Sequence, residues 1–424
     1  MFKNNRNNNF NEAMLSVDDA LNRVLKNINK LDSELVSIID SLDRVLSENI
    51  FSHVNVPYAN NSAMDGYAVK ANNLKTASSL TPIKLKVIDS IKAGDAPKSK
   101  LEDFTVIRIM TGSAIPEGAD AVLPFEYTKE EIFDSEKNIS YVTIIEKVLS
   151  GDYIRLSGKD VKEGEKVLNE GTVLRPPEIG LLASIGINKV NVIRKPIVSI
   201  LSTGDELIEP GEAYSEYMTY DSNTSLIVAS VLKCGGTPRV LGLARDDIQS
   251  VNEKLSLASG SDLLITTAGV SKGDYDIVKD VLSEKGSIDF WSVNMKPGKP
   301  LAFGNLDLGE GKLIPHLGLP GNPVSASVTF EQFGRNIIMK MLGKELSKNI
   351  INAVLDEPIY NLEGKRTYFR VIIEIKEGVY RAKLTGDQSS NLLTSLVNAN
   401  GLAICPENIQ KKDIGDTIEV QMLY

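Results

Sequence analysis

Acidic side chains follow apolar segments in the second half of this 424-residue chain. Glu206 comes a few residues after the run from Ile197 to Leu201, and two later apolar runs are also followed by acids. These later acids are Asp246 or Asp247, Asp274 and Asp276. Carboxylates gathered in one place repel one another unless a cation lies between them. A hard ion such as Mg²⁺, bound by one or two carboxylates and by phosphate oxygens, would remove that repulsion.

Three other segments carry groups that bind anions. The Gly-flanked loop from Ala268 to Gly273 can point backbone N–H groups at a phosphate. Lys296-Pro297-Gly298-Lys299-Pro300 holds two ammonium groups in a restricted segment, and Pro320-Gly321-Asn322-Pro323 leads into a helix N-terminus. Each segment alone has a structural explanation, but together they indicate a phosphorylated or oxyanionic ligand and a divalent metal. The candidate contacts are Gly269, Ser271, Gly273, Lys296, Lys299, Pro300 and Asn322.

The composition limits the classes of protein and site. With a net charge of −9, a general nucleic-acid surface is not expected, although a local basic pocket is compatible with it. The two cysteines are far apart and only two histidines exist, which argues against zinc, iron–sulfur and Ser-His-Asp sites. No apolar stretch approaches the ~20 residues of a membrane span. We therefore expect a cytoplasmic protein without a membrane partner, preceded by a disordered Asn-rich leader over residues 1–14.

Alternating strands and helices must position the acids. The run Ile197–Leu201 is short and β-branched, which is typical of a buried parallel strand. Ser222 or Asn223 is expected to cap a helix that ends at Gly235, and strands and helices then alternate. This pattern predicts a doubly wound α/β domain over residues 194–343. Ligands bind such sheets outside the carboxyl ends of the strands, where Glu206 and the later acids would converge.

The remaining chain predicts three further domains. Ser16 can cap a helix running to Leu31, and Ile39–Leu46 has helical spacing. A helix at Ile179–Ser184 completes a small, discontinuous helical domain formed by residues 15–48 and 152–193. Short apolar runs separated by turns predict a β-rich domain inserted over residues 49–151, and a C-terminal, β-barrel-like domain over 344–424. The fold class is thus multidomain α/β plus β.

Two polar segments leave alternatives open. The stretch Pro57–Val69 is too small and polar for a core helix, and its Asp65-Gly66 pair is a turn signal. A plain β-turn competes there with a functional loop. The charged stretch Gly151–Val167, which contains Asp160, is equally compatible with a solvated surface loop.

Six segments, in order, resemble the motifs of MoeA-type molybdopterin molybdenumtransferases, and the gephyrin E domain is similar. The resemblance runs from about Ser16 to the end of the chain. The segments are Ser62–Ala68, Thr111-Gly112, Gly118–Val122, Ser202–Leu207, Lys296–Pro300 and Leu319–Ser325.

The resemblance implies insertion of molybdate into adenylylated molybdopterin, with Mg²⁺-dependent release of AMP. It implies a four-domain homodimer, whose active cleft lies between the β-rich domain of one subunit and the third and fourth domains of the other. Other proteins of molybdenum-cofactor synthesis are expected partners. The α/β domain would resemble MogA.

The resemblance also implies roles for individual residues. The family's catalytic positions fall on Asp65, Thr111, Asp160, Glu206, Asp246 and Asp276. Of these, Glu206, Asp246 and Asp276 are the candidate metal ligands. Arg370 and Ser390 match positions tied to molybdate or substrate, beside Lys296 and Lys299. One departure is Ser292, because many members carry a basic residue after the Trp that matches Trp291.

The mechanism that the residues suggest agrees with this resemblance. Molybdate is a tetrahedral dianion and needs fixed cations, for which Lys296, Lys299 and Arg370 are candidates. The substrate's dithiolene sulfurs are the ligands of the inserted metal, so the protein needs no cysteine for that purpose. Two alternatives are weighed against the molybdenum-insertion enzyme. A molybdopterin adenylyltransferase would need only the α/β domain, and an inactive gephyrin-like scaffold would not need to retain every motif acid.

Overall fold

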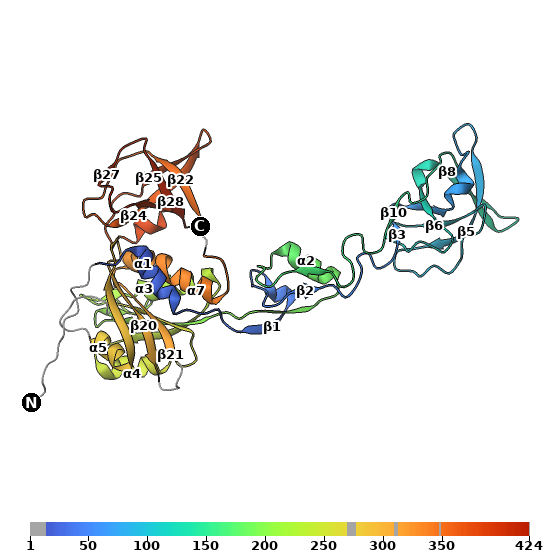
Figure 1. The fold of residues 1–424 in the computed structure, drawn as a ribbon. Coiled ribbons are helices and arrows are strands. Elements are labelled where there is room, and N and C mark those ends of the chain that lie inside the picture. Colours follow the sequence, from blue (N-terminus) through green and yellow to red (C-terminus); the bar gives the residue numbers. More distant parts are fainter. Residues whose placement is uncertain (1–13, 269–276, 309–312, 347–348, 424) are drawn as a thin grey trace, which may run out of the picture. The chain divides into compact units, whose positions relative to one another are not determined.

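The computed structural model describes residues 14–268, 277–308, 313–346 and 349–423. They form two compact units (Figure 1). One contains the chain up to Glu34, Asp43–Val45 and the chain from Ile193 onward, and the other contains Leu35–Leu42 and Leu46–Val192. The finer division into predicted domains stays a prediction. Five of the residues predicted to bind a metal or an anion lie outside the described residues, as does nearly all of the predicted leader. These candidates are Gly269, Ser271, Gly273, Asp274 and Asp276.

The α/β part of the first unit is built on a six-stranded sheet of order β16-β13-β17-β21-β20-β18. The first four strands are parallel to one another, β20 pairs antiparallel with β21, and β18 pairs antiparallel with β20. The strands are β13 (Ile197–Thr203), β16 (Thr237–Ala244), β17 (Leu263–Thr267), β18 (Gly286–Ser292), β20 (Pro300–Asp307) and β21 (Leu313–Leu319). The helices are α3 (Ser222–Cys234), α4 (Ile248–Ser256), α5 (Ile277–Lys285), α6 (Pro323–Thr329), the π-helical turn η4 (Phe330–Gly334) and α7 (Arg335–Met341). This topology confirms the predicted doubly wound domain.

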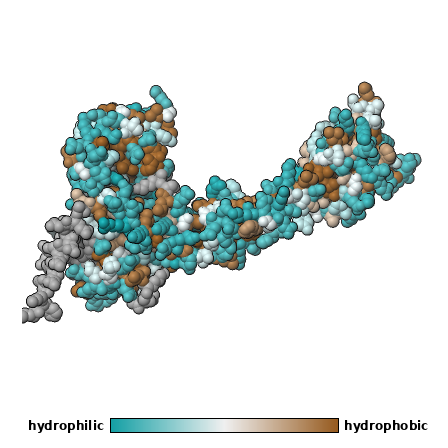
Figure 2. Space-filling view, viewed as in Figure 1, coloured by the Kyte–Doolittle hydropathy of each residue, from teal (hydrophilic) through white to brown (hydrophobic). Residues whose placement is uncertain are grey.

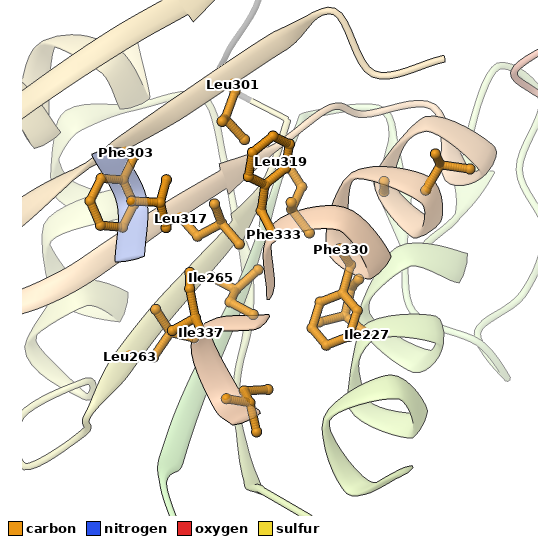
Figure 3. Packing of buried hydrophobic residues seen from close by; sticks show 14 of the residues in the cluster. Ile227, Leu263, Ile265, Leu301, Phe303, Leu317, Leu319, Phe330, Phe333 and Ile337 are labelled. Carbon is orange, nitrogen blue, oxygen red and sulfur yellow. The ribbon is translucent and has the colours of Figure 1, made fainter. Parts of the chain in front are cut away.

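Both faces of this sheet are buried. Neighbouring residues along each strand point to opposite sides, so they belong to different cores. Leu263 and Ile265 pack with Phe330 and Phe333 of η4 on one face (Figure 3), while Leu264 belongs to the core on the other face. The first face also receives α1 (Val17–Lys26), whose N-terminal residue Ser16 accepts a hydrogen bond from the Asp19 N–H as predicted. Burial on both faces explains why the strands read as continuous apolar runs.

The C-terminal part of the first unit is a closed five-stranded barrel, which confirms the predicted barrel-like domain. Its strands pair in the order β24-β25-β22-β28-β26 and β26 closes on β24. They are β22 (Ile350–Leu355), β24 (Arg366–Lys376), β25 (Val379–Leu384), β26 (Gly401–Cys405) and β28 (Thr417–Met422). The short strand β19 (Met295–Lys296), which leaves the α/β domain, pairs with β24. Smaller elements of the first unit are β14 (Leu207–Ile208) and β15 (Thr219–Tyr220) in the α/β part, and β23 (Ile359–Tyr360), β27 (Lys411–Lys412) and α8 (Thr394–Val397) in the C-terminal part.

The second unit contains the predicted β-rich domain as a six-stranded sheet of order β7-β4-β6-β5-β9-β8. Its strands are β4 (Gly66–Val69), β5 (Ile83–Ile91), β6 (Thr105–Ile109), β7 (Ala121–Pro124), β8 (Thr128–Asp134) and β9 (Ile139–Ile144). A separate core gathers around α2 (Pro176–Ser184). Shorter elements are β1 (Ser33–Ser37), η1 (Ile38–Ser41), β2 (Ile50–Phe51), β3 (Asn61–Ser62), η2 (Ala71–Leu74), η3 (Phe125–Tyr127), β10 (Ile154–Arg155), β11 (Lys166–Leu168) and β12 (Lys189–Ile193).

Three local predictions are wrong. The helix that Ser16 caps ends at Lys26, with Asn27 as its C-cap, and does not run to Leu31. The helix predicted for Ile39–Leu46 is only the single 3₁₀ turn η1, because Asp43 has a positive φ of 60° and Leu46 bridges to Val192 in an extended conformation. The three apolar positions that share a face, Leu42, Val45 and Leu46, span too few residues to outweigh this tertiary pairing. Helix α3 is capped by Asp221, whose carboxylate accepts the Thr224 N–H at 3.1 Å, and not by Ser222 or Asn223.

The visible face of each unit is largely hydrophilic, with apolar residues in separate patches (Figure 2). None of the helices within the described ranges has the length and apolar character of a membrane span.

Candidate functional site

A cavity of about 660 Å³ lies in the first unit, between the chain around β19 and one end of the barrel. Five of the predicted substrate residues line it, and they come from three separate stretches of sequence. These residues are Lys296, Lys299, Pro300, Arg370 and Ser390. The fold therefore brings together all three cations that the sequence suggested for an anion.

The lysine segment is held by backbone pairing at both ends. Lys296 in β19 pairs with Thr367 of β24, and the Lys299 carbonyl accepts the Val293 N–H at 2.8 Å. Between them Gly298 has a φ of 102°, and a Cβ there would lie 2.3 Å from Oγ1 of Thr329. Only glycine fits this close approach. The two ammonium groups thus project from a fixed backbone.

Arg370 is the most deeply buried charge at the cavity, with 1% of its surface exposed. Its guanidinium donates to Oγ of Ser395 at 3.1 Å and to the carbonyl of Ser389 at 3.1 Å. These acceptors are neutral, and within the described ranges no carboxylate is hydrogen bonded to it. Burial lowers the pKa of Arg370 to about 10, which leaves it charged at neutral pH. An anion in the cavity would supply the missing countercharge.

Ser390 links the cavity to the start of α6. The side-chain amide of Asn322 donates to Oγ of Ser390 at 3.1 Å, and the Val324 N–H donates to the Ser390 carbonyl at 3.2 Å. Asn322 precedes α6 directly and its side chain makes no capping bond with the helix. Asn322 is therefore bound to a lining residue of the cavity, in agreement with its predicted place near the ligand.

Three charged residues of the cavity, Glu363, Lys365 and Asp387, were not predicted from the sequence. Glu363 accepts a hydrogen bond from Nζ of Lys296 at 2.7 Å and forms a second ion pair with Lys365. These lysines hold the pKa of Glu363 at about 2. The available signal was the Glu363-Gly364-Lys365 turn just before a β pattern, which is indistinguishable from a solvated turn until β19 is paired with β24.

Two of the three predicted metal ligands lie at one edge of the α/β sheet. Glu206 follows β13 and Asp246 follows its neighbour β16, and the Asp246 N–H donates to the Asp205 carboxylate at 3.2 Å. At Gly204 the φ is 146°, and a Cβ would come within 2.6 Å of the Glu206 carboxylate. Both Glu206 and Asp246 are exposed, and their carboxylates make no hydrogen bond with any described residue.

This donor chemistry suits a hard cation such as Mg²⁺, because exposed carboxylate oxygens without protein partners remain able to bind one. No group of three acidic, histidine or cysteine side chains arranged around a metal position occurs among the residues that the structure describes. The third predicted ligand, Asp276, is not among them.

In the second unit, the structure joins Asp65 and Thr111. Asp65 lies in a turn before β4 and Thr111 follows β6, and these strands pair with Gly66 opposite Ile109. Oδ1 of Asp65 accepts the Thr111 N–H at 2.7 Å and the Thr111 hydroxyl at 2.8 Å. Both bonds lower the pKa of Asp65, the backbone bond most. Residues 63–65 form a bend between β3 and β4, which is compatible with both alternatives, and this bend presents an ionised carboxylate.

Asp160 is exposed in the same unit, in the segment for which a surface loop was the alternative. Its backbone N–H donates to the Val56 carbonyl at 2.9 Å. No side-chain bond from Asp160 to Asp65 or Thr111 is present among the described residues. The structure therefore joins two of the three catalytic candidates of this unit.

Three family models match consecutive parts of the chain. They are described as "MoeA N-terminal region (domain I and II)", over residues 15–186, "Probable molybdopterin binding domain", over 199–340, and "MoeA C-terminal region (domain IV)", over 352–423. A curated molybdopterin molybdenumtransferase from Haemophilus influenzae is 34% identical over 417 residues, which are 96% of this chain and 98% of that protein. One from Bacillus subtilis is 34% identical over 415 residues, covering 96% and 94%.

Solved structures agree in fold. Two crystal structures of the molybdopterin biosynthesis MoeA protein from Pyrococcus horikoshii have TM-scores of 0.81 and 0.77 to this chain. Their sequences are 29% and 28% identical to it. Each comparison covers 97% of this chain and at least 99% of the other. The likeness therefore extends over both units.

Replacing Thr111 by valine should raise the pKa of Asp65 toward, but not to, its ordinary value of 3.8, because the backbone bond remains. A ¹³C NMR titration of labelled aspartate carboxyls measures it. Since the folded-state pKa is lowered, the stabilisation from these bonds is complete at neutral pH and is lost as the pH falls through that pKa. Thr111→Ser keeps the hydroxyl, so Asp65 in this variant should titrate as it does in the unaltered protein. Equal Asp65 pKa values in the valine variant and the unaltered protein would show that the hydroxyl bond is not formed.

Proposed function

The chain belongs to the MoeA family of molybdopterin molybdenumtransferases, and from this we propose that it inserts molybdate into adenylylated molybdopterin and releases AMP. The observation that carries the proposal is the cavity lined by Lys296, Lys299 and Arg370 in a chain of net charge −9. Molybdate is a dianion, and charge-assisted N–H donors are the groups that hold such oxyanions best. A positive cavity in an acidic protein is thus suited to the proposed substrate.

The cavity residues bind and orient in this proposal. The buried guanidinium of Arg370 is fixed by Ser395 and the Ser389 carbonyl, so its remaining N–H groups can meet an oxyanion without reorganising. Lys299 has no ion-pair partner among the described residues and adds a second, adjustable cation. Ser390, held by Asn322, supplies a neutral hydroxyl beside them.

The acidic sheet edge is proposed to hold Mg²⁺ through Glu206 and Asp246, with Asp276 as the third ligand. The ion, when bound, would neutralise charge on the phosphate oxygens of the adenylylated substrate. Gly204 lets the Glu206 side chain fold over the end of β13, so the carboxylate stays close to the sheet edge. Asp65, kept ionised by Thr111, and Asp160 are proposed to orient substrate or transfer protons, as acids of the partner subunit.

A homodimer and a cytoplasmic location complete the proposal, together with contacts to other proteins of molybdenum-cofactor synthesis. Leu35, Ile39 and Leu42 in the second unit are 61%, 76% and 50% exposed, which is unusual for side chains of this size so close in sequence. Such apolar groups are typical of a surface that a second chain covers. Sedimentation equilibrium of the full chain tests the dimer, and a monomer at micromolar concentration would contradict it.

The assay is AMP release from adenylylated molybdopterin with molybdate and Mg²⁺. Glu206→Ala should lower the rate about a hundredfold or more, because it removes a carboxylate from the proposed metal site. Glu209→Ala, three residues away and also exposed, is the matched control and should retain the rate. Full activity of the Glu206 variant would exclude this residue from catalysis.

Supplying ATP and free molybdopterin in place of the adenylylated substrate tests the adenylyltransferase alternative. No turnover with either substrate would favour an inactive scaffold.

Lys299→Met should weaken molybdate binding about tenfold, the effect of losing one charge-assisted contact. Isothermal titration calorimetry on the full chain measures the dissociation constant. Because Lys299 is exposed and has no described partner, the variant should melt at the temperature of the unaltered protein. Lys26→Met, at the exposed end of α1, removes the same charge outside the cavity and should not change the affinity. Unchanged binding by the Lys299 variant would place the oxyanion elsewhere.

A further inference from the structure

A rigid turn holds a carboxylate at the exposed side of the cavity. The side-chain amide of Asn361, which is almost fully buried, donates to the carbonyls of Lys365 and Pro406 at 2.8 and 3.0 Å. Its oxygen accepts the Thr367 hydroxyl at 2.9 Å. These bonds fix both ends of the turn from Asn361 to Lys365. Glu363, at the centre of the turn, is therefore held in place by the backbone.

The Glu363 carboxylate bridges two ammonium groups. One oxygen accepts from Nζ of Lys296 at 2.7 Å, and the other pairs with Nζ of Lys365. This is the arrangement that an oxyanion with two oxygens would adopt between the same lysines. The side chains of Glu363 and Lys296 are 45% and 51% exposed, so an anion arriving from solvent can reach them.

The cations of the cavity are unequally compensated. Lys296 and Lys365 share the charge of Glu363, whereas Arg370 and Lys299 form no ion pair with a described carboxylate. Asp387 also lines the cavity, and its charge raises the pKa of Arg370, but its carboxylate accepts the Ser389 N–H and hydroxyl at 2.8 and 2.6 Å and no direct ion pair with Arg370 is present among the described residues. Arg370 is therefore the buried cation of the cavity that lacks a direct ion pair with a described carboxylate.

We propose that Glu363 is an internal counter-ion of Lys296 and Lys365, so that a substrate oxyanion is directed to Arg370, which has no direct ion pair with a described carboxylate, and must compete with Glu363 for Lys296. This positioning role rests on the proposed function. The carboxylate is tethered beside its lysines, so its effective concentration there is far above that of a free anion. The two lysines keep the pKa of Glu363 low, so the competition persists at neutral pH.

The charge of the ligand provides the test. A carboxylate near the bound anion repels it with an energy proportional to the anion's charge. Removing that carboxylate should therefore strengthen binding of a dianion more than binding of a monoanion of the same shape. Molybdate and perrhenate are such a pair, since both are tetrahedral and they differ by one charge. A residue that merely supports the turn would change both affinities equally.

The experiment compares Glu363→Gln with the unaltered full chain by calorimetry at low ionic strength, where screening is weak. We expect molybdate to bind about tenfold more tightly and perrhenate about threefold more tightly, because the repulsion energy doubles with the charge. Glu374→Gln is the matched control. Glu374 is an exposed carboxylate in the same barrel that pairs with Lys376 at 3.0 Å and does not line the cavity. The Glu374→Gln substitution should change neither the molybdate nor the perrhenate affinity. Thermal melts verify that both variants fold.

Equal shifts for the two anions, no shift, or the same shift in the Glu374 variant would overturn the counter-ion role. If the unaltered protein releases AMP and binds molybdate while the Glu363 variant behaves identically, only this inference fails. If neither protein binds molybdate and no AMP is released, the proposed function fails, and the counter-ion role fails with it.

Discussion

The interaction that organises the candidate site is the burial of Arg370 beside neutral hydrogen-bond acceptors. A guanidinium removed from water is costly unless its charge is balanced, yet its described partners are a hydroxyl and carbonyls of the 387–389 loop. The closed barrel supplies the stability that holds it, because Arg370 lies in β24, which pairs with strands on both sides. Together with the surrounding lysines, such a cation suits an anionic ligand, as the proposed function requires.

The paired strands explain how distant residues reach this cation. Strand β19 leaves the α/β domain and joins the barrel at β24, which carries Lys296 to the cavity. The Asp65–Thr111 pair in the second unit is formed in the same way, since β4 and β6 lie side by side and join residues 46 positions apart. In each case, backbone pairing sets the geometry and the functional side chains follow from it.

Secondary structure was predicted correctly where burial of a strand produces a run of apolar residues in the sequence. The run at Ile197–Leu201, which only Ser199 interrupts, predicted β13 because a strand covered on both faces is mostly apolar. Prediction from the sequence failed at Ile39–Leu46, where the spacing suited a helix but the chain pairs as an extended segment. It also failed at Asp221, since three polar residues in a row can all cap a helix and the backbone decides which one does.

The residues that line the cavity could be predicted from the sequence only in part. Lys296 and Lys299 stand out by their own spacing, but Arg370 and Ser390 were found through the family resemblance. Glu363 and Lys365 escaped both routes, because a short charged turn has no local sign of what lies opposite it. The acids at the sheet edge were predicted from their positions after strands, and the structure places Glu206 and Asp246 just after the neighbouring strands β13 and β16.

The most direct test of the account is anomalous X-ray scattering from crystals of the full chain grown with molybdate, recorded at the molybdenum edge. The account predicts a molybdenum peak in the cavity within hydrogen-bonding reach of the Arg370 guanidinium. A molybdenum peak only at another place in the molecule, or no peak at saturating molybdate, would contradict it.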